Sequence, residues 1–109
     1  MERVHFIGIG GSGLSAIARL LAESGWPVSG SDRAASPLAA ELVKLGVRVS
    51  IGHAPENVSG AQIVVRSSAV PDENPEVQAA LAAGIPVLKR AQFLGRLMQA
   101  KRGIAVAGT

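Results

Sequence analysis

Residues 4–25, "VHFIGIGGSGLSAIARLLAESG", decide the fold of this chain. A short apolar run leads into a glycine-rich turn, and Leu14, Ile17, Ala18 and Leu21 then recur at helical spacing. Gly25 follows as a C-terminal stop. This order predicts a strand, a tight turn and a helix.

The same alternation continues along the chain. Ser36 and Asn74 are placed as helix N-caps, each followed by proline. Further strands are expected at 27–32, 47–53, 61–68 and 85–89, helices at 36–46, 74–84 and 91–100, and one short helical turn at 54–60. Alternating strands and helices predict an α/β fold, a Rossmann-like parallel sheet of five strands with helices on both faces. Residues 103–108, "GIAVAG", are a candidate sixth strand.

Composition excludes several classes of protein. The 109 residues suffice for one domain, with a core of small aliphatic residues because only 3% are aromatic. The absence of cysteine excludes disulfides and cysteine-based metal sites. The net charge is only +3 and the eight arginines are scattered, so no nucleic-acid partner is expected. No stretch approaches the ~20 apolar residues of a membrane span. We therefore expect a cytoplasmic protein with no membrane partner.

The glycine-rich turn has the G-x-G-x-x-G spacing at Gly8, Gly10 and Gly13. Between a strand and a helix, this spacing favours binding of a diphosphate at the helix N-terminus. Asp32 lies 19 residues after Gly13, at the end of the second expected strand, where a carboxylate accepts hydrogen bonds from ribose hydroxyls. The alternative is that Asp32 only caps the loop that follows it. Taken alone, these features also fit an NAD- or FAD-binding domain of an oxidoreductase.

Polar residues follow each expected strand. Because ligands of such folds bind at the carboxyl ends of the strands, these residues are expected to converge on one rim. After the glycine turn come "GSD" at 30–32, "GH" at 52–53, "SSA" at 67–69 and "KR" at 89–90. His5, within the first strand, is expected to be a packed strand residue.

The ordered set of "HFIGIGGSGLSAIARLL", "VSGSD", "GH", "SSAVPDENPEVQAA", "IPVLKRAQFLGRLM" and "GIAVAGT" resembles the N-terminal domain of the Mur ligases over essentially the whole chain. Within that family, the "GGSG" pattern favours the alanine-adding member over the murein-tripeptide recycling ligase. The family more often has glutamate at Gln92 and an apolar residue at Arg66. Arg66 is interpreted as a strand-end residue reaching solvent, with an extra cation near the diphosphate as the alternative.

The resemblance implies a site for the uridine diphosphate moiety of UDP-N-acetylmuramate. Backbone N–H groups of the glycine loop would bind the diphosphate, with the Ser12 hydroxyl as a further donor, and the polar residues of the rim would face the uridine. Lys89 and Arg90 are left as either phosphate contacts or solvated cations. The expected substrate-binding residues are Gly10, Gly11, Ser12, Gly13, Ser31, Asp32, His53, Ser67 and Ser68.

The resemblance also implies that residues 1–102 form the UDP-sugar-binding domain and that 103–109 begin a central ATPase domain, before its "HGKTTT" phosphate loop. In the parent reaction ATP would phosphorylate the substrate carboxylate, L-alanine would attack the acyl phosphate, and Mg²⁺ would offset charge. No catalytic residue or metal ligand is assigned here, so the 109-residue chain alone is expected to be inactive. A non-catalytic nucleotide-binding module is the remaining alternative.

Overall fold

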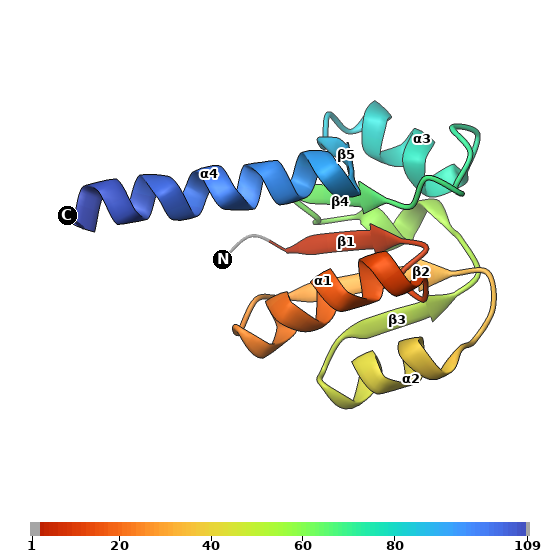
Figure 1. Cartoon of the computed structure of the whole chain (residues 1–109). Coiled ribbons are helices and arrows are strands. Elements are labelled where there is room, and N and C mark those ends of the chain that lie inside the picture. The colour runs from red at the N-terminus through yellow and green to blue at the C-terminus, as the bar shows by residue number, and fades with distance from the viewer. Residues whose placement is uncertain (1–2, 109) are drawn as a thin grey trace.

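The computed structural model describes the backbone of residues 3–108 and the side chains of residues 3–99 apart from Ser12. Five parallel strands form one sheet in the order β3-β2-β1-β4-β5 (Figure 1). The strands are β1 (Val4–Ile7), β2 (Val28–Asp32), β3 (Arg48–Ile51), β4 (Ile63–Arg66) and β5 (Val87–Lys89). The predicted α/β fold and its five strands are confirmed.

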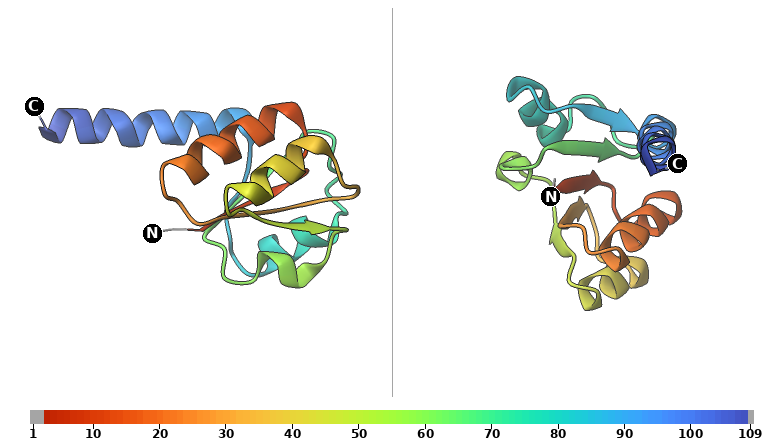
Figure 2. Two further views of the ribbon diagram at one scale, coloured as in Figure 1. Left: turned by 90° about the horizontal axis from the view of Figure 1, so that it is seen from below. Right: turned by 90° about the vertical axis from the view of Figure 1, so that its left-hand side faces the viewer.

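The helices cover both faces of the sheet. Figure 2 shows α1 (Ser12–Glu23), α2 (Pro37–Lys44) and α4 (Arg90–Gly108) on one face. The 3₁₀ turn η1 (Pro55–Val58) and α3 (Pro75–Ala82) lie on the other face. From β1 the chain first adds β2 and β3 on one side, and then returns to add β4 and β5 on the other side. The switch point lies between β1 and β4, and a ligand of this fold would bind at the rim beyond the carboxyl ends of these two strands.

Side chains of β1 alternate between two separate cores, as a strand buried on both faces requires. Val4 and Phe6 pack under α1, α2 and α4, where Phe6 meets Phe93 edge to face with ring centroids 6.1 Å apart. Ile7 packs with Val64 and residues of η1 and α3 on the other face. His5, the remaining side chain of β1, is also fully buried.

Both predicted helix caps are present. The Ser36 hydroxyl accepts a hydrogen bond from Ala39 N, and the Asn74 side chain accepts one from Glu76 N. Each cap satisfies a backbone donor that the first turn leaves unpaired. The caps fix where α2 and α3 begin, and so fix the loops that lead into them from the rim.

The candidate sixth strand is wrong. Residues 103–108 continue α4, which projects beyond the sheet (Figure 1). A strand needs a neighbour to pair its backbone N–H and C=O groups, whereas a helix pairs them within the segment. The edge strand β5 is only three residues long and offers few such groups. No helix within residues 3–108 is long and apolar enough to cross a membrane.

Candidate functional site

The glycine turn after β1 is held against β2 by backbone hydrogen bonds. Gly8 N and Ile9 N both donate to the Ser31 carbonyl oxygen, at 2.8 and 3.0 Å. Gly8 has a φ of 85°, and a Cβ there would lie 3.0 Å from the Ser67 Cβ. Glycine is therefore required at this position by both conformation and space.

Asp32 fixes the second glycine of the turn. Its Oδ2 accepts from Gly10 N at 2.8 Å, and its Oδ1 accepts from Arg33 N at 2.8 Å. A Cβ on Gly10 would lie only 2.7 Å from the same Oδ2. Asp32 thus binds both the glycine turn and the start of the loop that follows β2. Its predicted contact with a ribose stays a prediction.

The start of α1 forms the positive end of a helix dipole at the rim. Gly11 is the N-cap and makes no side-chain cap hydrogen bond, and the first turn holds no acidic residue. Such a terminus attracts anions through its N–H groups and its dipole. Two backbone donors of the turn already have partners: Gly10 N donates to the Asp32 Oδ2, and Gly11 N donates to Gly8 O. The donors for an anion are therefore those of the first helical turn. The predicted Ser12 hydroxyl lies outside the described side chains.

Two cations from the far end of the chain lie beside this terminus. Arg90 packs across Gly13, where an added Cβ would lie 3.3 Å from the Arg90 Cδ and 3.4 Å from its Nε. Lys89 ends β5, and its backbone N donates to the Gln92 Oε1 at 2.8 Å, which is half of a capping box at the start of α4. Glutamine makes this hydrogen bond as well as the glutamate that the family more often has at this position. A hollow of about 490 Å³ is lined by Gly11, Gly13, Leu14, Ser67, Ser68, Lys89, Arg90 and Ala91.

A second hollow, of about 580 Å³, adjoins the first and shares Gly11 and Ser67 with it. Asp32 and His53 line it from the ends of β2 and β3, and the loop before α3 closes the opposite side. Six of the predicted rim residues thus line one or the other hollow: Gly11, Gly13, Asp32, His53, Ser67 and Ser68.

Ser31 does not face either hollow. Its side chain is fully buried, and its hydroxyl lies 2.7 Å from the Glu76 Oε1 and 2.9 Å from the His53 Nδ1. The sequence prediction that Ser31 faces a uridine does not match this placement. Side chains alternate along β2, so that Asp32 reaches the rim while Ser31 points into the α3 face of the sheet.

Glu76 is the functional candidate that sequence reasoning missed. It is fully buried and joins His5, Ser31 and Asn57 through hydrogen bonds of 2.6 to 2.9 Å. Burial by itself raises the pKa of Glu76, but the hydrogen bonds from these three side chains and the charge of His5 outweigh it and lower the pKa from 4.5 to about 2. In the sequence, Glu76 is only an acidic residue in the first turn of a capped helix, which is common on any surface helix.

Arg66 serves the loop after β4. Its guanidinium pairs with Asp72 and donates to the Val70 carbonyl, and its side chain is only 14% exposed. Arg66 is the last residue of β4, as predicted, but its side chain is largely covered by this loop and does not extend into solvent. The alternative role beside a diphosphate stays a prediction. The bonds of Arg66 to Val70 and Asp72 hold the loop that borders the second hollow.

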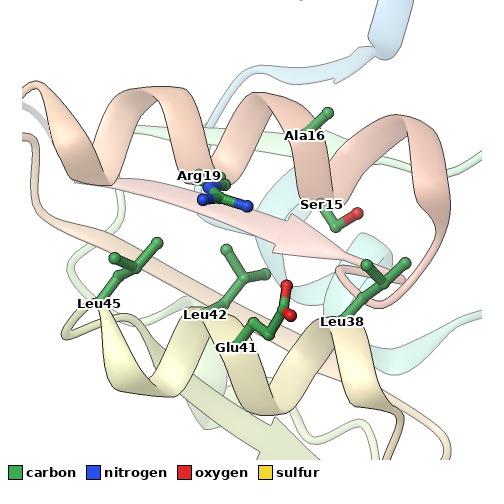
Figure 3. Close-up of a pocket in the computed structure, with 7 residues that line it drawn as sticks. All are labelled: Ser15, Ala16, Arg19, Leu38, Glu41, Leu42 and Leu45. Atoms are coloured by element: carbon green, nitrogen blue, oxygen red, sulfur yellow. The ribbon is translucent and has the colours of Figure 1, made fainter.

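A further hollow of about 230 Å³ lies away from the rim, between α1 and α2 (Figure 3). None of the predicted site residues lines it. Its lining is mostly aliphatic, with one exposed charge from each helix: Ser15, Ala16, Arg19, Leu38, Glu41, Leu42 and Leu45.

The parallel sheet, the glycine turn and the rim at its carboxyl end place the chain in the class of Rossmann-type α/β domains. Residues 3–102 match the Mur ligase family, catalytic domain. The chain belongs to the Mur ligase family.

Similar proteins support that assignment. Over all 109 residues the chain is 54% identical to a UDP-N-acetylmuramate--L-alanine ligase of Bordetella avium, and it spans 23% of the length of that relative. The solved UDP-N-acetylmuramate-alanine ligase from Thermotoga maritima superposes with a TM-score of 0.86 at 31% identity, over 92% of this chain and 23% of that one.

A second solved structure is that of a ligase named for a related substrate. The UDP-N-acetylmuramate:L-alanyl-gamma-D-glutamyl-meso-diaminopimelate ligase from Neisseria meningitides gives a TM-score of 0.78 at 29% identity, over 88% of this chain and 31% of that one. Both the TM-score and the coverage of this chain are lower than for the alanine ligase. These similarities give no support to the oxidoreductase alternative.

Proposed function

We propose that this chain is the domain that binds UDP-N-acetylmuramate in an ATP-dependent ligase that adds L-alanine to that substrate during peptidoglycan synthesis in the cytoplasm. The family assignment and the names of the most similar relatives support this proposal. The observation that carries it is the convergence of the α1 N-terminus, Lys89 and Arg90 on one hollow of the rim.

The two hollows suit the two parts of a nucleoside diphosphate. Two cations and a helix N-terminus favour the diphosphate at the first hollow. The second hollow offers Asp32 and His53, which suit the hydroxyl and N–H groups of a nucleoside. The domain would thus hold the nucleotide part of the substrate, so that binding energy remote from the reacting carboxylate positions it for the chemistry.

ATP, Mg²⁺ and L-alanine would bind to other parts of a complete ligase. The glycine turn is not followed by the lysine and the Ser/Thr of an ATP phosphate loop. Among the described side chains, those of residues 3–99 apart from Ser12, no group of three acidic or histidine residues could hold a metal ion. The 109-residue chain is accordingly expected to release no phosphate from ATP when UDP-N-acetylmuramate, L-alanine and Mg²⁺ are all present.

The ligand class is tested by thermal unfolding of the chain with UDP, UDP-N-acetylmuramate or NAD at equal concentration. A ligand at about 100 times its dissociation constant adds roughly 2.7 kcal/mol to the free energy of unfolding, so the two uridine nucleotides should raise the Tm more than NAD. Stabilisation by NAD with none by UDP would refute the proposal.

The site is tested by Arg90→Ala, with Arg19→Ala as the matched control. Hydrogen bonds to charged groups contribute roughly 1.5–3 kcal/mol, so loss of Arg90 should weaken UDP binding about tenfold or more in calorimetry. Arg19 is exposed on α1, away from the rim hollows, and its loss should leave UDP affinity unchanged. Equal affinities of the two variants would remove Arg90 from the site.

A further inference from the structure

We infer that Glu76 is a positioning residue of the nucleotide site: with Ser31 it holds His53 in the tautomer protonated on Nδ1, leaving Nε2 to accept a hydrogen bond from a hydroxyl or N–H group of the nucleoside. The assignment of a nucleoside to this part of the rim rests on the proposed function. The tautomer itself follows from the network of hydrogen bonds alone.

The carboxylate of Glu76 is surrounded by donors. Oε1 lies 2.6 Å from the His5 Nε2 and 2.7 Å from the Ser31 Oγ. Oε2 accepts from Asn57 Nδ2 at 2.9 Å and from Ala54 N at 3.1 Å, and lies 3.4 Å from the His53 Nδ1. An ionised carboxylate only accepts hydrogen bonds, so its four hydrogen-bond partners, His5 Nε2, Ser31 Oγ, Asn57 Nδ2 and Ala54 N, must each donate to it. The low pKa of Glu76 is consistent with the ionised form.

The direction of the Ser31 hydrogen bond fixes that of His53. Ser31 has one hydroxyl proton, and it is used toward Glu76. The His53 Nδ1 lies 2.9 Å from the same hydroxyl oxygen, so Nδ1 must carry a proton and donate it. The nearby Oε2 of Glu76 favours the same arrangement.

The remaining ring nitrogen of His53 is the one that a ligand can use. His53 lines the second hollow with a side chain that is 19% exposed, while its Nδ1 edge is turned inward to Ser31 and Glu76. In a neutral imidazole with Nδ1 protonated, Nε2 is an acceptor. An acceptor suits a ribose hydroxyl or the imide N–H of a uracil and disfavours a phosphate oxygen. His53 therefore accepts a hydrogen bond from the nucleoside, while Arg90 and Lys89 lie beside the diphosphate.

If Glu76 only stabilised the fold, replacing it would not change which ring nitrogen of His53 carries the proton. The test is therefore a two-bond ¹H–¹⁵N spectrum of the histidine-labelled 109-residue chain near neutral pH, with His53→Asn to assign the two histidines. We expect a pyrrole-like shift for Nδ1 of His53 and a pyridine-like shift for Nε2. A pyridine-like Nδ1 in the unaltered chain would overturn the inference without any variant.

Glu76→Gln sharpens the test. Its side-chain amide can donate, so the Ser31 hydroxyl is free to turn and donate to Nδ1, and the Nε2–H tautomer becomes populated. UDP affinity should fall about threefold to tenfold, the effect of one hydrogen bond. Glu23→Gln removes an exposed carboxylate of α1 and should change neither the tautomer nor the affinity. An unchanged tautomer and affinity in Glu76→Gln would overturn the inference.

If Glu76→Gln does not fold, Ser31→Ala serves in its place. It removes the acceptor at 2.9 Å and leaves only the Glu76 Oε2 at 3.4 Å, so the preference for Nδ1–H should weaken and UDP affinity should fall. The two failures are distinguishable. Loss of the proposed function would appear as an unaltered chain that does not bind UDP, whereas failure of this inference would appear as UDP binding with the opposite tautomer.

Discussion

The two faces of the sheet are built from different chemistry, although they share the same five strands. Under α1, α2 and α4 the core cluster consists of hydrocarbon side chains, among them the edge-to-face pair of Phe6 and Phe93. Under η1 and α3 an aliphatic cluster lies beside a buried polar network of His5, Ser31 and Glu76. The first face depends on packing, and the second also depends on a single ionised carboxylate.

This difference shows how the rim is supported. The hydrocarbon face carries α1, whose N-terminus faces the first hollow, and α4, whose first residue is Arg90. The polar face reaches the second hollow through His53. Rigid packing thus places the diphosphate side of the proposed site, while the polar network orients the nucleoside side. Each face can be broken separately.

Phe6→Ala should have the largest effect. The side chain is fully buried and its ring packs against Phe93, so its removal leaves a cavity that costs about 3–5 kcal/mol of unfolding free energy. Urea unfolding measures this loss. Leu20→Ala is the control, because Leu20 is 56% exposed on α1 and its truncation should change stability by no more than about 0.5 kcal/mol. Similar losses in both variants would contradict the described core.

Low pH should have the second-largest effect, because it destabilises the polar face. The folded-state pKa of Glu76, about 2, lies below its ordinary value of 4.5, so Glu76 contributes stability above pH 4.5 that is lost as the pH falls toward 2. The full shift corresponds to about 3 kcal/mol. Urea unfolding at several pH values should show this loss in the unaltered chain and in Glu23→Gln, but much less of it in Glu76→Gln. The same pH dependence in all three chains would count against an ionised, buried Glu76.

Gly30→Ala tests the packing of the hydrocarbon face on a smaller scale. A Cβ at Gly30 would lie 2.7 Å from the Ile9 Cβ, so the added methyl overpacks the contact and should cost about 1–3 kcal/mol. Gly95→Ala, in α4, meets nothing within 4 Å and should be neutral or stabilising by up to about 1 kcal/mol. Thermal unfolding of the two variants gives the comparison, and a stabilising Gly30→Ala would disprove the close approach.

Ser36→Ala should have the smallest effect. The hydroxyl accepts from Ala39 N at 3.2 Å, and removing such a cap costs about 1 kcal/mol. Ser36→Asp keeps an acceptor at the same place and should retain most of the stability. If the aspartate and alanine variants unfold at the same urea concentration, the cap does not contribute as described.

The elements of the fold could be predicted because their signals are local. Ser36 and Asn74 sit next to the prolines that begin α2 and α3, and the glycine turn directly precedes α1. The prediction failed at residues 103–108, where an apolar run suits either a helix or a strand and only a pairing partner would decide.

The polar network could not be predicted, because its members are far apart in the sequence. Glu76 is 71 residues from His5 and 45 from Ser31, and no spacing rule connects them. The direction of Ser31 depends on the register of β2, which sends its side chain inward and that of Asp32 to the rim. One missed residue did have a signal: a glycine inside a strand, such as Gly30, marks the close approach of another group, here Ile9.

The central claim is that a uridine diphosphate binds at the rim and not in the groove between α1 and α2. Titration of UDP into the ¹⁵N-labelled 109-residue chain, followed by backbone amide chemical shifts, tests it most directly. The account predicts shifts at Gly11, Gly13, Ser67 and Arg90, with no change at Ala16, Leu38 and Leu45, which line the groove (Figure 3). Shifts confined to the groove residues, or none at saturating UDP, would contradict it.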